Sequence, residues 1–292
     1  MHPTPLPGKA YLDILGKILV FLLVFRSKLS YDRFWAGRIA LAGMGHSTCT
    51  LVTDTSVFFE ADTEEQIKCR GEVYRLALAT YVCMLIHIRK DARELVELHR
   101  ITDVDDKGYM AEEDARQITA LVSAGLLTEE EKTKVCGGGM SYVNVCATLC
   151  AQKLKSGFQA SYIHRNLMMD VDGGMKKMLG AWSAAQKTAL FPFPFPYIQA
   201  LTIFNLLFLA TLPMAMVQSM GPWTAPAVGM ITLGFLGLDT VGGQLEDPFG
   251  TDANDLDLGS FAQDTADACF VALRARDGAA VKLYEIGDII NQ

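Results

Sequence analysis

The chain has 292 residues, 50% of them hydrophobic, and a formal net charge of −7. This balance excludes a disordered chain and favours a membrane protein or one with a large buried core. The acidic charge argues against a nucleic-acid-binding protein, which normally presents a basic face. The seven cysteines include no CxxC pair, so neither a zinc site nor a disulfide framework is predicted. The sequence lacks HExxH, GxSxG, P-loop and Rossmann motifs, and we expect no enzyme.

The first apolar segment lies near the N-terminus, with an unbroken run at residues 18–25. This run is too short to span a bilayer alone, but it can extend over residues 5–26 if Asp13 and Lys17 avoid lipid. Charged residues inside a span usually face a partner or a water-filled cavity. One stripe at helical spacing holds Lys17, Phe21 and Phe25. Alternatively, the lysine reaches the membrane interface and both phenylalanines meet lipid.

The next segment, "FRSKLSYDRFWAGR" at residues 25–38, has the pattern of a helix that leaves the membrane. Arg26 and Lys28 suit the membrane boundary, and Asp32 can pair with nearby arginines. The aromatic residues at helical spacing are Tyr31, Phe34 and Trp35.

Residues 46–187 have the pattern of a soluble, all-helical region. Residues 64–101 are predicted to form a long amphipathic helix, and residues 141–157 another. Two short helices flank Gly125, and Thr128 begins the second of them with a capping box.

A possible calcium loop, "DVDDKGYMAEED", runs from Asp103 to Asp114. Its first, third and sixth positions fit an EF-hand. Lys107 stands where an oxygen ligand is needed, and the last position lacks the longer glutamate. We therefore favour a turn that links two helices.

A run of 51 residues, from Thr188 to Leu238, contains no Asp, Glu, Lys, Arg or His. Because a bilayer takes about 20 helical residues, the run predicts two spans, residues 199–217 and 225–243. The turn between them has three helix breakers and one aromatic suited to an interface: Gly221, Pro222, Pro226 and Trp223.

Proline alternates with phenylalanine just before the first of these spans. Residues 192–196 are predicted to be extended, because proline has no N–H and fixes φ, with the helix starting near Tyr197. The segment either anchors the chain by its aromatics or forms a pore-lining elbow of Pro194, Pro196 and Ile198.

The acidic segment "GGQLEDPFGTDANDLDL", residues 242–258, follows the second span. It fails the EF-hand spacing, because Asp257 and Gln263 occupy the positions of the glycine and the final glutamate. Asp252, Asn254 and Asp255 are predicted to cap a helix at about residues 260–276. Helix capping and metal binding are the two alternatives, and capping is favoured.

Three segments together resemble the bestrophin family of anion channels: "FRSKLSYDRFWAGR", "FPFPFPYIQALT" and "QLEDPFGTDANDLDL". The resemblance covers about residues 10–275 and is to plant, algal and bacterial members rather than animal ones. It implies an all-α integral membrane protein, a homo-pentamer in lipid with one central pore that passes chloride or bicarbonate. In its family motif the matching residues are Tyr31, Asp32, Arg33 and Trp35.

The resemblance also assigns the stripe of Lys17, Phe21 and Phe25 to the narrow neck of the pore. Lysines around a pore would raise the local anion concentration, and the weakly positive edges of phenyl rings tolerate a desolvated anion. The acidic segment matches a calcium clasp, with Gln244, Asp247, Asp252 and Asp255 at the clasp positions. Thr251 replaces an acid of animal members, and the clasp ligand near the N-terminus has no counterpart.

Family members carry a further transmembrane helix before the neck helix, whereas only about ten residues precede it here. The alternative function is therefore a membrane-anchored helical scaffold, or a non-conducting subunit that has lost this helix. A third alternative is a soluble calcium-binding regulator. The sequence divides into four predicted regions, residues 1–45, 46–187, 188–243 and 244–292. The protein is expected in a thylakoid or a plasma membrane. Neither a signal peptide nor a transit peptide is recognised.

Overall fold

The structure is a computed structural model that describes residues 7–98, 112–137, 142–191, 194–250, 252 and 254–291. Every regular element of these residues is a helix, and the β contacts among them amount to one isolated bridge. This confirms the predicted all-α class. The chain forms two compact units, Met1–Ala36 with Phe191–Asp255, and Gly37–Leu190 with Leu256–Gln292. Helix α1 (Pro7–Phe58) contributes to both units.

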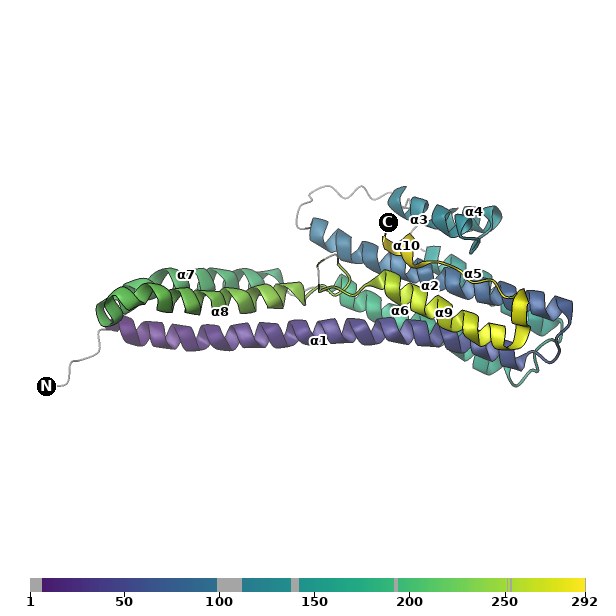
Figure 1. The fold of residues 1–292 in the computed structure, drawn as a ribbon, viewed down its shortest axis with the longest axis horizontal. Coiled ribbons are helices and arrows are strands. Elements are labelled where there is room, and N and C mark those ends of the chain that lie inside the picture. Colours follow the sequence, from purple (N-terminus) through teal and green to yellow (C-terminus); the bar gives the residue numbers. More distant parts are fainter. Residues whose placement is uncertain are drawn as a thin grey trace. The chain divides into compact units, whose positions relative to one another are not determined.

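The first unit contains a helical hairpin of α7 (Phe195–Met220) and α8 (Thr224–Gln244), which lie side by side (Figure 1). A short 3₁₀ turn, η2 (Gly221–Trp223), joins them, and its glycine has a φ of +52°. A positive φ is accessible to glycine without steric cost, which lets the chain reverse here. Each predicted span is therefore one helix.

Two prolines lie differently from their predictions. Pro226 is the third residue of α8 and does not break the helix, because the first helical turn tolerates a missing N–H. Pro196 likewise lies in the first turn of α7, which begins at Phe195 rather than near Tyr197. The other end of the predicted extended segment, Pro192, lies outside the described residues.

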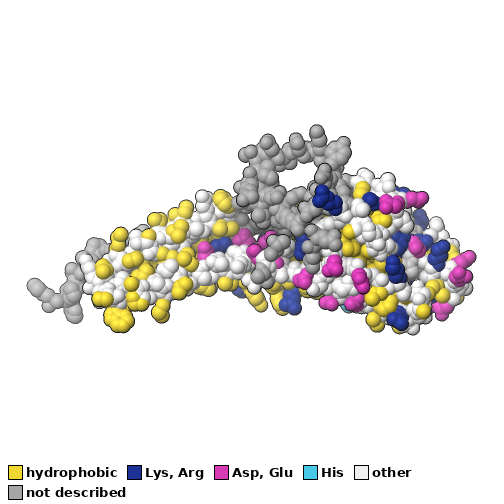
Figure 2. Space-filling view, turned by 45° about the horizontal axis from the view of Figure 1, so that its top comes forward, with side chains coloured by type: hydrophobic (Ala, Val, Ile, Leu, Met, Phe, Trp, Pro, Cys, Tyr) yellow, Lys and Arg dark blue, Asp and Glu magenta, His cyan; other side chains and the backbone are white. Residues whose placement is uncertain are grey.

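The hairpin exposes most of its apolar surface. The stretch Phe195–Gln244 is long and apolar enough to cross a membrane, and only 17% of its most apolar part is buried. Figure 2 shows hydrophobic and uncharged side chains over this part of the chain. In α1 the apolar residues are interrupted by Asp13, Lys17 and Arg26, so this helix is a poorer candidate for direct contact with lipid.

The second unit is built around α2 (Glu64–Leu98), which packs against α5 (Tyr142–Gln159), α6 (Met168–Leu190) and α9 (Leu258–Asp277). The prediction of an amphipathic α2 is wrong over its middle. The segment Glu64–Arg89 is apolar enough to span a membrane, yet 89% of its most apolar part is buried inside the structure. A helix that is hydrophobic all round is a core helix when its neighbours enclose it.

Smaller helices complete this unit: α3 (Glu112–Ser123), α4 (Glu129–Gly137), η3 (Gly278–Ala280) and α10 (Gly287–Asn291). The predicted capping box is confirmed. The Glu131 amide donates to Thr128 Oγ1 at 3.2 Å, and the Thr128 amide donates to Glu131 Oε2 at 2.9 Å. Of the possible calcium loop from Asp103, residues 103–111 lie outside the described residues.

Candidate functional site

The N-terminal half of α1 has two distinct faces. Leu19 and Leu23, each 1% exposed, belong to an apolar cluster with Leu201 and Phe208 of α7. On another face, Phe21 is 69% exposed and Phe25 is 47% exposed. Their ring centroids lie 6.3 Å apart with an angle of 13° between the planes. We call these two residues the aromatic stripe. The stripe is open to the surroundings of the single chain, while the leucines fix α1 against the hairpin.

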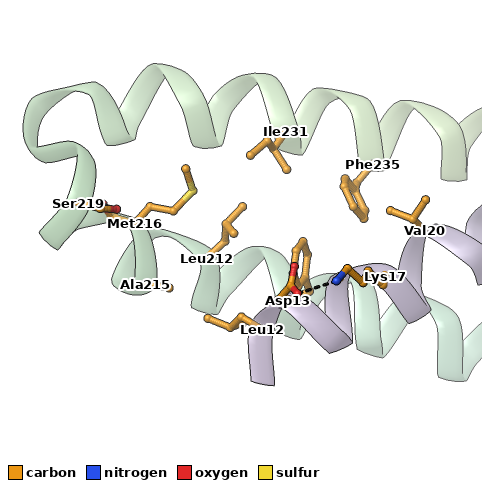
Figure 3. A pocket seen from close by; sticks show the side chains of 12 residues that line it. Leu12, Asp13, Lys17, Val20, Leu212, Ala215, Met216, Ser219, Ile231 and Phe235 are labelled. Atoms are coloured by element: carbon orange, nitrogen blue, oxygen red, sulfur yellow. Dashed lines mark hydrogen bonds and ion pairs between the residues drawn. The ribbon is translucent and has the colours of Figure 1, made fainter. Parts of the chain in front are cut away.

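Lys17, the third predicted neck residue, has a partner that the sequence pattern did not predict. Its Nζ lies 2.7 Å from Asp13 Oδ2, one helical turn earlier, and both side chains are mostly exposed. The pair lies at the edge of a cavity of about 660 Å³ within the first unit (Figure 3). The carboxylate offsets much of the positive charge that the lysine would bring to a pore. Much of the remaining lining consists of apolar side chains of α7 and α8, among them Leu212, Met216, Ile231 and Phe235.

A buried ion cluster joins α1 to the end of α8. Arg26 Nη1 is bonded to Asp239 Oδ1, and Arg26 Nη2 lies 3.6 Å from Glu246 Oε2. The three side chains are 7%, 20% and 14% exposed. The sequence pattern predicts Arg26 at the membrane boundary but does not identify its partners. One signal was available: Asp239 is the first charged residue after the 51-residue uncharged run, just as Arg26 ends the first apolar run.

The family motif on α1 contacts both ends of the hairpin. Arg33 donates to the carbonyl of Phe191 before α7, and its Nε donates to the carbonyl of Glu246 after α8 at 3.1 Å. Burial lowers the pKa of Arg33, and the neighbouring acids Glu246 and Asp247 oppose this shift. Arg33 therefore ties together segments more than 150 positions away, at 191 and 246, and has a positioning role in this unit.

The other motif residues lie on the exposed surface of α1. Tyr31 and Trp35 stack with ring centroids 6.4 Å apart and an angle of 10° between the planes. Asp32 is bonded to Lys28 one turn earlier, rather than to an arginine as predicted. Exposed pairs of this kind contribute little to stability, so the stack and the pair describe an accessible helix face.

The predicted elbow residues surround the start of α7. Pro194 occupies the N-cap position and is exposed, as is Pro196, whereas Ile198 is half-buried. Between them, the Tyr197 hydroxyl donates to the carbonyl of Leu22 on α1 at 3.2 Å. This bond holds the start of α7 against α1. Its acceptor, Leu22, directly follows Phe21 of the aromatic stripe.

In the acidic segment, the residue that caps the next helix is not one of those predicted. Asp257 is the N-cap of α9, and its carboxylate accepts from the amides of Gly259 at 3.0 Å and Ser260 at 3.2 Å. Asp252, Asn254 and Asp255 lie earlier in the loop, because α9 begins at Leu258, two residues before the predicted start. The aspartate directly before the helix can reach its free N–H groups.

Two of the predicted clasp residues meet at Gly250. A Cβ atom at this glycine would lie 2.7 Å from Asp255 Oδ2 and 3.1 Å from Asp247 Oδ2. Burial raises the pKa of Asp247, and nearby Arg33 opposes this shift. Asp252 lies beside them with an exposed side chain: its amide donates to Asp255 Oδ2, and its carbonyl accepts from the Asp255 amide at 3.0 Å. Gln244 instead accepts from Asn254 at its Oε1, at 2.8 Å. Among the described residues, no three His, Cys, Asp or Glu side chains group as metal ligands, so a calcium ion would need backbone carbonyls as well.

Comparison with known proteins agrees with this arrangement. The family described as "Bacterial/Fungal Bestrophin protein" matches residues 5–270. A protein of Nostoc sp., named a voltage-dependent anion channel-forming protein, is 27% identical, and the alignment covers 82% of this chain and 70% of that protein. A protein of the same name from Synechocystis sp. is 26% identical, with 84% and 71% covered. Both are named as channel-forming proteins rather than enzymes.

The fold is likewise that of solved bestrophin structures. A bacterial bestrophin homologue from Klebsiella pneumoniae superposes with a TM-score of 0.73 and 23% identity, covering 90% of this chain and 87% of that one. The resemblance found in the sequence is thus confirmed at the levels of family and fold. With the exposed apolar hairpin, these findings identify an integral membrane protein, and the chain belongs to the bestrophin family.

Proposed function

We propose that the chain is one subunit of a bestrophin-type anion channel, in which five copies of α1 surround a central pore for chloride or bicarbonate. The observation that carries this proposal is the aromatic stripe, which is exposed while Leu19 and Leu23 on another face of the same helix are buried. In a ring of subunits, such a face can form a narrow apolar constriction. The relatives named as anion channel-forming proteins support the same reading.

The distribution of charged residues between α1 and the hairpin also supports a pore along α1. The hairpin of α7 and α8 is suited to lipid, because most of its exposed residues are apolar and it carries no charge before Asp239. Helix α1 carries Asp13 and Lys17 on its exposed surface, and charged residues in a membrane segment are tolerated where they face water. Anions would then meet a nearly neutral ion pair first and the phenyl edges of Phe21 and Phe25 next.

The aromatic stripe gives the first testable prediction. Phe21→Ala should widen the constriction, so that a large anion such as gluconate passes more easily relative to chloride. We expect the gluconate-to-chloride flux ratio to rise about tenfold, which corresponds to a lower relative barrier of about 1.4 kcal/mol. Purified protein in liposomes, with a flux assay for each anion, measures this ratio.

Phe204→Ala is the matched control, because Phe204 is also a phenylalanine on a membrane helix and is 46% exposed, but lies on α7. We expect it to leave the flux ratio unchanged. An unchanged ratio in the Phe21 variant, with normal chloride flux, would remove α1 from the constriction. If the native protein carries no anion at all, the alternative of a membrane-anchored scaffold or non-conducting subunit holds instead. Native mass spectrometry tests the number of subunits, and fractionation of the source cells distinguishes the thylakoid from the plasma membrane.

Calcium control at the acidic loop is the second part of the proposal. It is supported by the carboxylates of Asp247 and Asp255, which meet at Gly250. Because only two carboxylates converge, we expect weak binding, with a Kd on the order of 10⁻⁴–10⁻³ M. Calorimetric titration with calcium should show this binding, and Asp255→Asn should abolish it. The control is Asp264→Asn, an exposed acid on α9, which should bind as the native chain does. Equal heats for the two variants would refute a site at Gly250.

A further inference from the structure

Helices α1 and α9 lie side by side within the second unit and keep one register along their length. At Gly45 an added Cβ would lie 2.6 Å from Thr265 Oγ1, so the two helices approach closely there. Further along, Arg276 on α9 donates to the carbonyl of Ser56 on α1, a pair separated by 220 positions. Gly45 and Thr265 have the same separation. The two helices therefore run in the same direction, and residues that face each other are 220 positions apart in the sequence.

Cys49 and Cys269 are a facing pair between these two contacts, again separated by 220 positions. Their sulfur atoms lie 3.4 Å apart, and Cys49 Sγ is also 3.7 Å from the carbonyl oxygen of Thr265. A disulfide needs a sulfur–sulfur distance of about 2.05 Å and Cα atoms within about 7 Å. The close approach at Gly45, one turn earlier, keeps the backbones near each other. Small side-chain rotations can then close the remaining gap between the sulfurs.

The two thiols also differ in accessibility and in pKa, the two properties that decide which of them an oxidant attacks first. Cys49 is partly exposed and Cys269 is buried. Cys269 donates its hydrogen bond to Cys49, which lowers the pKa of the Cys49 thiol against the opposing effect of burial. The thiolate is the reactive form of cysteine, so Cys49 is both the more accessible and the more nucleophilic partner.

A second facing pair in the same unit provides a contrast. Cys83 and Cys146 are hydrogen-bonded to each other, but both are 0% exposed. An oxidant in solution cannot reach either sulfur while the unit is folded. Both pairs therefore hold two thiols close together, but only the pair of Cys49 and Cys269 includes a thiol that an oxidant can reach.

We propose that Cys49 and Cys269 form a reversible disulfide when a peroxide reaches Cys49. The Cys49 thiolate attacks one oxygen of the peroxide, the O–O bond breaks, and Cys49 becomes a sulfenic acid as hydroxide leaves. The Cys269 sulfur then attacks the Cys49 sulfur, the S–O bond breaks, and water leaves as the disulfide forms. Two thiols are oxidised and one peroxide is reduced to two waters. A dithiol reductant reverses the modification.

The bond would join α1 to α9 covalently in the middle of their shared register. Since α1 is one continuous helix from Pro7 to Phe58, the modification falls on the helix that also carries the aromatic stripe. The proposal itself is independent of anion conduction and is tested by chemistry alone.

The test treats the purified full chain in detergent with hydrogen peroxide, blocks remaining thiols by alkylation, and maps peptides without reduction. We expect a linked peptide pair that contains Cys49 and Cys269, with a mass two hydrogens below the sum of the free peptides. Dithiothreitol should restore alkylation of both residues. Cys83 and Cys146 should stay reduced during the peroxide treatment. Both should therefore be alkylated once the protein has been unfolded.

Two variants complete the design. Cys269→Ser should remove the linked pair and leave Cys49 as a sulfenic or more oxidised acid. Cys136→Ser removes another partly exposed thiol and should leave the linked pair intact. The proposal is wrong if Cys49 in the native chain remains fully alkylated, is oxidised without the link, or links to Cys49 of a second chain.

Discussion

Replacing Arg26 by methionine should destabilise the first unit by about 3–5 kcal/mol, the cost of removing one partner from a buried ion cluster. Methionine keeps an unbranched apolar stem, so the main change is the lost charge. Asp239 and Glu246 would then remain largely buried without the cation that bridges them. Because whole domains are stable by only about 5–15 kcal/mol, we expect much less monodisperse protein on gel filtration and a clearly lower Tm.

The expected reversal identifies the cause. In Arg26→Met combined with Asp239→Asn and Glu246→Gln, no charge is left buried, and we expect part of the lost stability to return. The matched control is Lys28→Met, two residues further along α1. Lys28 pairs with Asp32, but both side chains are exposed, so this change should cost less than about 1 kcal/mol. Equal melting temperatures for the Arg26 and Lys28 single variants would contradict the assigned role of the cluster.

The second large effect is expected at Arg70, whose side chain is 0% exposed within the second unit. Its Nε donates to Asp277 Oδ2 at 3.0 Å, and Nη2 donates to the other oxygen of this carboxylate. Nη1 donates to the carbonyl of Ala61 at 3.0 Å. These bonds join the start of α2, the loop before it and the end of α9. Arg70→Met should therefore cost about 3–5 kcal/mol, because it leaves Asp277 buried and 2% exposed.

Thermal unfolding and limited proteolysis of purified variants measure this effect. Arg70→Lys should recover only part of the stability, because an ammonium group cannot form the two parallel bonds that a guanidinium forms with a carboxylate. Asp62→Asn is the control. Asp62 also lies 3.0 Å from Arg70 and 2.8 Å from Arg276, but it is 63% exposed, so this change should lower the Tm much less than Arg70→Met does. If the methionine variant melts as the Asp62 variant does, the bidentate pair is not what holds these elements together.

The membrane hairpin was predictable because its physical cause is local. A run of uncharged residues long enough for two spans can be read directly from composition, and glycine with proline shows where the chain turns. Two errors remained in this region: α7 begins at Phe195 rather than near Tyr197, and Pro226 lies in the first turn of α8 instead of breaking the helix. Helix boundaries depend on which free N–H groups find acceptors, and this depends on the surroundings as much as on the sequence.

The character of α2 could not be predicted from its own residues. Its apolar middle is compatible with a membrane span, with an amphipathic surface helix and with a core helix, because all three bury apolar side chains. The structure shows a core helix, enclosed by α5, α6 and α9, which come from distant parts of the chain. Periodicity describes one helix at a time, whereas burial is a property of its neighbours.

For the candidate site, the sequence by itself determined the family, the all-helical class, the membrane hairpin and the stripe that holds Phe21 and Phe25 at helical spacing. Only the tertiary structure decided which partners the charged side chains find. Arg26 pairs with Asp239, Arg33 donates to carbonyls at the two ends of the hairpin, and Asp257 rather than Asp255 caps α9. It also brought Cys49 within 3.4 Å of Cys269. The physical reason is range. Hydropathy and helical period act over a few residues, whereas ion pairs and thiol contacts act between atoms that are neighbours only after the chain has folded.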